Sequence, residues 1–183
     1  MAKQFSGISD SHRQFIQEQH IFFCVTAAPE NRINLSPKGM DSLRILGPNR
    51  ILRMNRTGSG NETAAHLRQD RRMTLMWCSF GKRPMIMRAY GSARTLHPRD
   101  ADWADLAAHF PADFAARQLF DMHVEMLQTS CGYGVPFFEF TGERDTLQRW
   151  AQDRGPEGVK TYWAERNQTS IDGAPTGILE DGK

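Results

Sequence analysis

Short strand-like segments separated by turn residues fill most of the chain up to position 130, and they do not alternate regularly with helices. A parallel sheet needs a crossover connection between successive strands, so this order argues against a parallel α/β fold. Many short strands with turn signals between them favour an antiparallel barrel or sandwich. We expect strands at 20–28, 32–35, 42–46, 50–55, 73–80, 85–96 and 118–130, with a bulge at Gly91.

Helices are expected at 9–19 and, between strands, at 62–69. The other helical patterns gather late in the chain, at 98–109, 143–153 and 156–167. The sequence of 183 residues is long enough for one hydrophobic core. We therefore predict a mainly β (α+β) protein with flanking helices and a single domain at 1–168. Its core is expected at about 12–130, followed by a helical extension at 131–168 and a loose tail at 169–183.

Basic residues are concentrated in the middle third of the sequence. Between positions 44 and 99 there are eleven arginines and one lysine against two acidic residues, whereas from position 100 onward fifteen acidic residues stand against seven basic ones. The guanidinium group offers a planar fork of donors that suits phosphate and carboxylate. The middle third is therefore predicted to bind an anion. The alternative is that these arginines pair with the acidic C-terminal third.

The cysteines and histidines give no sign of a metal site. The three cysteines are widely spaced and form no Cys-x-x-Cys pair, and the six histidines lack the spacing of metal ligands. We expect a reduced, cytoplasmic protein with no structural metal. The start of the sequence lacks the apolar stretch of a signal peptide, and the longest apolar run is far too short to span a bilayer, so no membrane partner is expected.

The clearest candidate for ligand binding is the segment 56–63, which follows a predicted strand and opens a predicted helix. Its two glycines allow a tight turn in which amide N–H groups converge, and the helix N-terminus adds partial positive charge. Arg56, Thr57 and Ser59 supply further donors, and Asn61 can cap the helix. This pattern predicts a phosphate cradle, although an ordinary Gly/Ser connection has the same composition. Ser36 and Lys38, at the end of a neighbouring strand, are the second candidates for the same anion.

Several segments in order resemble the pyridoxamine 5′-phosphate oxidase-like family of FMN-binding split barrels. They are 34–40 (NLSPKGM), 42–46 (SLRIL), 57–67 (TGSGNETAAHL), 73–77 (MTLMW) and 88–94 (RAYGSAR), and the similarity covers roughly 12–130. The later segments 128–136 and 142–150 resemble a branch of this family without an assigned substrate. The resemblance implies a six-stranded antiparallel split barrel that forms a homodimer with FMN at the subunit interface.

The resemblance also implies where the cofactor lies. The FMN phosphate would be held by the segment 56–62, and the isoalloxazine would lie along the strands at 73–79 and 85–90. The family's Ser-Arg-Lys run is replaced here by Gly60, Asn61 and Glu62, so Lys38 or Arg44 would have to replace the lysine. The candidate cofactor-binding residues are Ser36, Lys38, Arg44, Arg56, Thr57, Ser59, Asn61, Glu62, Trp77, Arg88 and Tyr90.

These features indicate an FMN-dependent oxidoreductase of unknown substrate, with no catalytic residue assigned. The alternatives are a non-enzymatic flavin-binding storage or sensor protein and a deazaflavin-dependent reductase. Nucleic-acid binding is disfavoured, because the net charge is only +2 and no RNP motif is present. The C-terminal third lacks the oxidase's Arg-Leu-His-Asp-Arg substrate segment, so we expect a donor other than pyridoxamine 5′-phosphate. The apolar residues Met73, Met76, Trp77, Met85 and Met87 are expected to supply the homodimer interface.

Overall fold

One antiparallel sheet forms the centre of the protein. The computed structural model describes residues 2–180, in which eight strands form the sheet in the order β3-β2-β6-β7-β8-β5-β4, with β1 paired to β8. The mainly β (α+β) class is therefore confirmed, with two strands more than the six of the expected barrel. The strands are β1 (Lys3–Phe5), β2 (Phe22–Thr26), β3 (Asn34–Lys38), β4 (Leu43–Gly47), β5 (Arg50–Arg56), β6 (Arg72–Cys78), β7 (Ile86–Leu96) and β8 (Ala116–Ser130).

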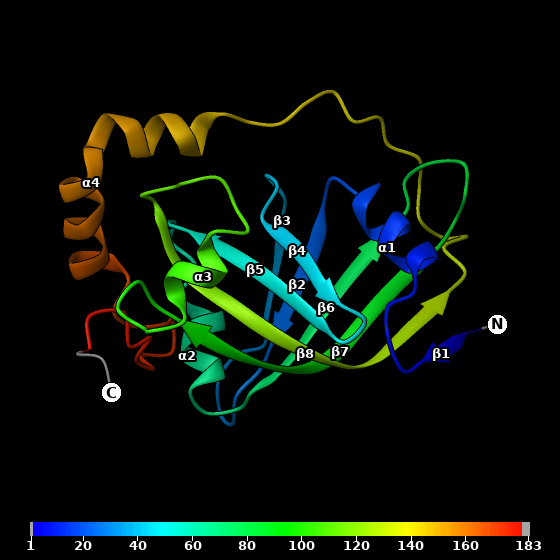
Figure 1. Cartoon of the computed structure of the whole chain (residues 1–183), viewed down its shortest axis with the longest axis horizontal. Helices are drawn as coiled ribbons and strands as arrows, with labels where there is room; N and C mark the ends of the chain where they lie inside the picture. The colour runs from blue at the N-terminus through cyan, green and yellow to red at the C-terminus, as the bar shows by residue number, and fades with distance from the viewer. Residues whose placement is uncertain (1, 181–183) are drawn as a thin grey trace.

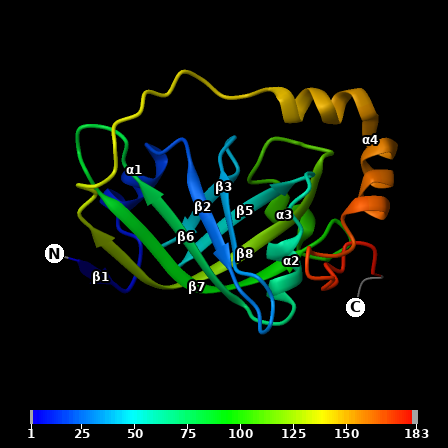
Figure 2. The same ribbon diagram turned by 180° about the vertical axis from the view of Figure 1, so that it is seen from behind.

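The sheet curls into a barrel that is split along one side (Figures 1 and 2). The strands β3 and β4 stand at the two ends of the strand order. They are consecutive in sequence, but no pairing joins one to the other among the residues that the structure describes. The split therefore lies between β3 on one side and the β4–β5 hairpin on the other.

Four helices flank the sheet, and they are α1 (Asp10–Gln17), α2 (Glu62–Leu67), α3 (Trp103–Ala107) and α4 (Thr146–Arg166). The start of α1 follows from local chemistry, because the Ser9 side chain accepts a hydrogen bond from the backbone N–H of His12. The two late helices that were predicted separately are both present within α4, which is interrupted at Gly155, where φ is 67° and ψ is 173°, just before Pro156. Within residues 2–180, no helix is long and apolar enough to cross a membrane.

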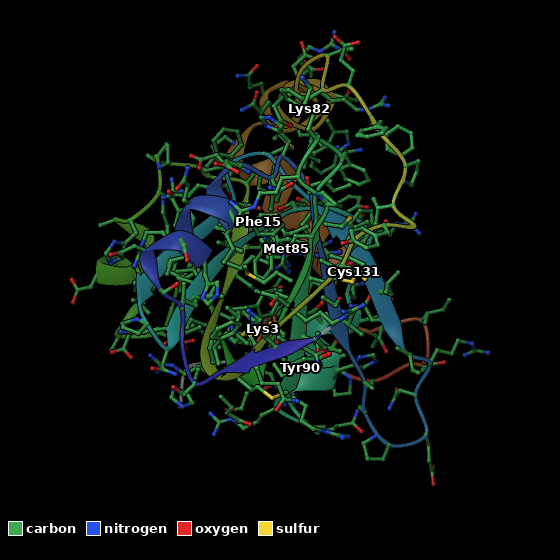
Figure 3. All side chains as sticks on the ribbon, turned by 90° about the vertical axis from the view of Figure 1, so that its right-hand side faces the viewer. Lys3, Phe15, Lys82, Met85, Tyr90 and Cys131 are labelled. Carbon is green, nitrogen blue, oxygen red and sulfur yellow. The ribbon has the colours of Figure 1, made fainter. Side chains whose placement is uncertain are left out.

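The core is divided between the two faces of the curled sheet. The main cluster fills the barrel and includes Phe15 of α1, whereas a second cluster lies between β5, β8 and α3. In Figure 3, Phe15 and Met85 lie near the centre of the view, and Met85 packs against the same main cluster. The expectation that the Met and Trp side chains supply an interface is wrong for Met73, Trp77 and Met87, which are at most 2% exposed inside this chain's own barrel.

The C-terminal segment is packed against the body of the protein, so the expectation of a loose tail is wrong for residues 169–180. Thr176 is 1% exposed and Ile178 is 6% exposed. The Asn61 side chain, at the start of α2, donates to the backbone carbonyl of Thr169. Figures 1 and 2 both show this red segment beside α2, below the end of α4. Residues 181–183 lie outside the described part of the chain.

Candidate functional site

Polar side chains line the inside of the barrel at its split. Ser36 and Lys38 of β3 lie directly opposite Cys24 and Phe22, which are buried in the main core, so all four share the inner face. Across the split, the guanidinium group of Arg53 lies 4.7 Å from the centre of the Phe120 ring, which belongs to the same core cluster. The inner face therefore carries polar and cationic groups from both sides of the split.

Three cations meet in this region: Lys38, Arg53 and Arg117, which we call the interior cation cluster. Arg53 and Arg117 are each 2% exposed, and Lys38 is half-buried. None of the three forms an ion pair with any residue of the described chain. Buried charges in proteins are normally paired, so an unpaired cluster of one sign is unusual.

The charges of the interior cation cluster repel one another. Burial, followed by repulsion from Arg53, lowers the pKa of Lys38 to about 8. Burial, followed by the same repulsion, lowers the pKa of Arg117 to about 10, and burial lowers the pKa of Arg53. Glu62 is the acid whose charge acts on this group, but its carboxylate accepts from the backbone of Asn61 at 3.0 Å and makes no ion pair with the cluster.

Some hydrogen-bond donors of the interior cation cluster have no acceptor among residues 2–180. The Asn55 amide lies between the two arginines. In one orientation its oxygen accepts from Arg53 Nη2 at 3.3 Å, and in the flipped orientation it accepts from Arg117 Nε at 3.0 Å. The Nε atom of Arg53 is buried without a hydrogen-bond partner, and the ammonium group of Lys38 has no partner among residues 2–180. A phosphate would fit these residues, because it would neutralise the cluster and accept from the donors that are now unsatisfied.

The predicted phosphate cradle at 56–62 is occupied by the protein itself. Arg56 pairs with Asp113 at 2.6 Å and donates to the carbonyl of Met40 at 2.7 Å. Thr57 is fully buried, donates to the carbonyl of Ala115 and accepts from the indole of Trp163. The donors of these two side chains are therefore committed to the fold.

The glycine loop also presents the wrong groups for a cradle. The carbonyls of Gly58 and Gly60 accept from Arg117, so carbonyl oxygens of this loop face the cation cluster. Asn61 holds the C-terminal segment through the carbonyls of Arg166 and Thr169, while Ser59 is exposed. The loop positions Arg117, and its amides do not converge on an open site.

The remaining predicted residues lie in different places. Arg44 is bound by Asp41 at 2.6 Å and lies over the Phe110 ring, on the wall covered by α3. Trp77 is buried inside the barrel, whereas Arg88 and Tyr90 alternate with buried residues and face outward on β7. Figure 3 shows Tyr90 at the lower edge of the sheet, away from Phe15. Of the predicted set, only Ser36 and Lys38 line the split beside the cation cluster.

Arg53, Asn55 and Arg117 were missed by the sequence interpretation. A signal for the first two was present, because Ile51, Arg53 and Asn55 stand two residues apart on one predicted strand and therefore share a face. Two polar residues on the face of a buried isoleucine indicate a polar interior. Arg117 had no such signal, because the strand that contains it was expected to begin one residue later.

His97 should make the protein sensitive to acid. It is 6% exposed and contacts Gln118, and burial, followed by repulsion from Arg99, lowers its pKa to about 4. The folded pKa is below the unfolded value, so the stabilisation is complete above pH 6.5 and is lost as the pH falls towards 4, by up to about 3 kcal/mol. Urea unfolding at pH 7 and pH 4.5 measures this loss. His97→Gln should remove most of it, and an unchanged pH dependence in that variant would contradict the assignment.

An antiparallel barrel that is split along one side defines a split-barrel protein, and here unpaired cations lie inside the split. Residues 8–131 match the pyridoxamine 5′-phosphate oxidase family. The pyridoxamine 5′-phosphate oxidase family protein ustO of Aspergillus flavus is 31% identical over 191 residues, which cover 93% of this chain and 76% of ustO. The chain therefore belongs to the pyridoxamine 5′-phosphate oxidase family.

Solved structures share the fold at low sequence identity. A putative pyridoxamine 5′-phosphate oxidase from Lactobacillus delbrueckii matches with a TM-score of 0.55 at 12% identity, covering 67% of this chain and 94% of that chain. HutZ, the heme storage protein from Vibrio cholerae, matches with a TM-score of 0.51 at 13% identity, covering 69% and 98%. The FAD-binding protein from Mycobacterium smegmatis matches with a TM-score of 0.50 at 13% identity, covering 68% and 96%. These similarities support the split-barrel fold.

Proposed function

We propose that this protein binds FMN and holds its phosphate with Lys38, Arg53 and Arg117 at the split of the barrel. The observation that carries this proposal is the interior cation cluster itself, which has two fully buried guanidinium groups, no ion pair within residues 2–180 and an unsatisfied Arg53 Nε. A dianionic phosphate offsets the repulsion among these groups and accepts charge-assisted hydrogen bonds from Lys38 and Arg53, while Arg117, whose donors are bound to the glycine loop, contributes its charge. Membership of a flavoprotein-related family and a fold shared with an FAD-binding protein agree with a flavin nucleotide.

The activity we propose is that of a flavin-dependent oxidoreductase. Bound FMN supplies hydride and electron transfer, so the protein itself needs no acid–base pair for that chemistry. The contribution of this chain is to bind the phosphate in a mostly buried setting, where charged hydrogen bonds are stronger than in water. Non-enzymatic flavin storage would use the same phosphate contacts, and reduction of the bound flavin by a nicotinamide or another donor distinguishes the two functions.

The phosphate should determine the affinity for the cofactor. We expect FMN to bind at least about tenfold more tightly than riboflavin, because riboflavin lacks the group that the three cations contact and a hydrogen bond to a charged group contributes about 1.5–3 kcal/mol. Fluorescence titration of the flavin-free protein with each compound measures this difference.

Two further ligands sharpen this test. A site that accepts only a terminal phosphate should bind FMN and reject FAD, whereas a site that also accepts a nucleotide diphosphate should bind both. Hemin, whose propionates are also anionic, tests whether the cluster serves a porphyrin. Equal affinities for FMN and riboflavin would contradict the phosphate site, and tight binding of hemin without binding of FMN would replace the flavin proposal.

We also propose that the protein forms a homodimer. The residues with large exposed apolar side chains are different from those expected, and they include Leu35 on the edge strand β3, at 62% exposed, and Ile33 just before it, at 73% exposed. An exposed apolar edge strand favours association with a second chain. Light scattering should give twice the chain mass of 20.8 kDa. Leu35→Glu should shift the protein towards monomer and Leu179→Glu, at another exposed leucine, should not. A wild-type monomer at micromolar concentration would refute the proposal.

A further inference from the structure

A second basic region lies outside the barrel, between the end of β7, the end of α2 and the C-terminal segment. It is a hollow of about 400 Å³, which we call the arginine basin, and its charged lining consists of Arg68, Arg71, Arg94 and Arg99 with the carboxylates Asp100 and Glu180. Thr95 and His97 also line it. It is separate from the interior cation cluster, none of whose residues line it. Its size is within the range of sites for small ligands.

The charges of the arginine basin are only partly compensated. Arg68 pairs with Glu180 at 2.9 Å, and Arg94 pairs with Asp102 and Asp121 at 2.9 and 3.1 Å. Arg99 donates only to backbone carbonyls of the C-terminal segment, which are neutral.

The Arg71 side chain has neither an ion pair nor a hydrogen bond in the described part of the chain. Two of the four guanidinium charges, those of Arg71 and Arg99, therefore have no carboxylate partner among residues 2–180. Exposed arginines are common on protein surfaces, but here they converge on one hollow.

One hydroxyl group in the lining of the arginine basin has no hydrogen-bond partner among residues 2–180. The Oγ1 atom of Thr95 is buried without a hydrogen-bond partner. His97, whose lowered pKa keeps it uncharged at neutral pH, lies beside it and is 6% exposed. A buried hydroxyl without a partner costs free energy.

The positive surface continues beyond the arginine basin. Arg71 and Arg94 also line an adjoining hollow of about 350 Å³, to which Arg50 contributes a further guanidinium group. Asp121 accepts from Arg50 at 2.8 Å and also pairs with Arg94, so one carboxylate serves two arginines there. Arg71 is thus the shared, unpaired cation of both hollows, and it is the residue on which an anion would depend most.

We propose that the arginine basin binds a ligand with two or more closely spaced negative charges, of the phosphate or pyrophosphate class. Each planar guanidinium group can donate two hydrogen bonds to the oxygens of a phosphate. The neighbouring carboxylates neutralise only part of the positive charge, so an anion can still bind and can also be released. The ligand would be a substrate or reductant that carries a phosphate group, bound at a site distinct from the proposed FMN phosphate site.

Inorganic pyrophosphate is the probe that tests this site, by isothermal titration calorimetry at constant ionic strength. The titration uses the Lys38→Met background, in which the interior cation cluster is weakened. We expect Arg71→Ala to weaken pyrophosphate binding at least fivefold. Arg72→Ala is the matched control, because Arg72 is the adjacent exposed arginine, is bonded to Asp70 and does not line the basin. It should leave the affinity unchanged.

Each outcome decides the proposal independently of the flavin. Absence of pyrophosphate binding, or equal losses in Arg71→Ala and Arg72→Ala, would overturn it, the second because the binding would then depend on surface charge alone. If the wild-type protein binds pyrophosphate, Lys38→Met abolishes the binding and Arg71→Ala alone leaves it unchanged, the proposal is overturned and the pyrophosphate belongs to the interior cluster. Thermal unfolding of Arg71→Ala checks that its fold is intact, which we expect because its exposed side chain makes no bond within residues 2–180.

Discussion

Replacing Lys38 with methionine should weaken FMN binding by about 10- to 100-fold, the range that corresponds to the loss of one hydrogen bond to a charged group. In the same variant, the FMN-free protein should unfold at a higher urea concentration. These opposite effects have one cause, because the Lys38 ammonium is held among Arg53 and Arg117 without a carboxylate partner. The charge that attracts the phosphate therefore destabilises the protein when the phosphate is absent.

The pKa of Lys38 predicts how this destabilisation depends on pH. Its folded value of about 8 is below the unfolded value of 10.5. The cost of the charge is therefore complete below pH 8 and disappears as the pH rises towards 10.5, by up to about 3 kcal/mol. The wild-type protein should gain stability between pH 8 and pH 10, and Lys38→Met should not show this gain.

Lys82→Met is the matched control, because Lys82 is exposed on the turn between β6 and β7, as Figure 3 shows at its upper edge. Neither FMN affinity nor stability should change in that variant. Fluorescence titration and urea unfolding measure the two quantities separately. Unchanged FMN affinity in Lys38→Met, together with raised stability, would mean that Lys38 is only a destabilising residue and that the phosphate binds elsewhere.

The elements of the fold were predictable because their signals are local. On β6, the alternation of Met73, Leu75 and Trp77 with more exposed residues matches the two-residue period of a strand with one buried face. The cap at Ser9 and the bulge at Gly91 are also encoded within a few residues, and the predicted bulge is confirmed. The strand β1 was missed, because three residues are too few to show a period.

The candidate site was less predictable because its contacts join distant parts of the chain. Arg53 and Arg56 lie three residues apart on β5 and therefore on opposite faces, and the sequence does not say which face is inside. Arg56 forms an ion pair with Asp113, which is distant in sequence, and therefore stabilises the fold. Arg53 lies over the Phe120 ring and has no acidic partner among residues 2–180. The glycine loop has the composition of a phosphate cradle, but the C-terminal segment, more than a hundred residues later, occupies its polar groups.

Gly91→Ala should lower the free energy of unfolding by about 3 kcal/mol or more, at or beyond the upper end of the usual cost of overpacking. A Cβ atom at this position would lie 1.9 Å from the backbone carbonyl oxygen of His123 and 3.1 Å from the Cα atom of Val124. Both are backbone atoms of β8, so no side-chain rotation can relieve the clash. The neighbouring strand itself would have to move.

The position of Gly91 makes such a movement costly. The register between β7 and β8 shifts between Tyr90 and Gly91, and this pairing is the longest in the sheet. β8 also pairs with β5, which carries Arg53, so displacement of β8 would disturb the interior cation cluster as well as the ladder. We therefore expect Gly91→Ala to lower both stability and FMN affinity.

Gly47→Ala provides the control, because Gly47 also lies on a strand but has no atom within 4 Å of the position of an added Cβ. Alanine there should be neutral or slightly stabilising, since it restricts the unfolded chain without a clash. Urea unfolding of the two variants and of the wild type measures the difference directly. A difference of less than about 1 kcal/mol between the free energies of unfolding of Gly91→Ala and Gly47→Ala would be well below the usual cost of overpacking. It would mean that β8 moves easily at the bulge and that the close approach of the two backbones does not fix the register of the barrel.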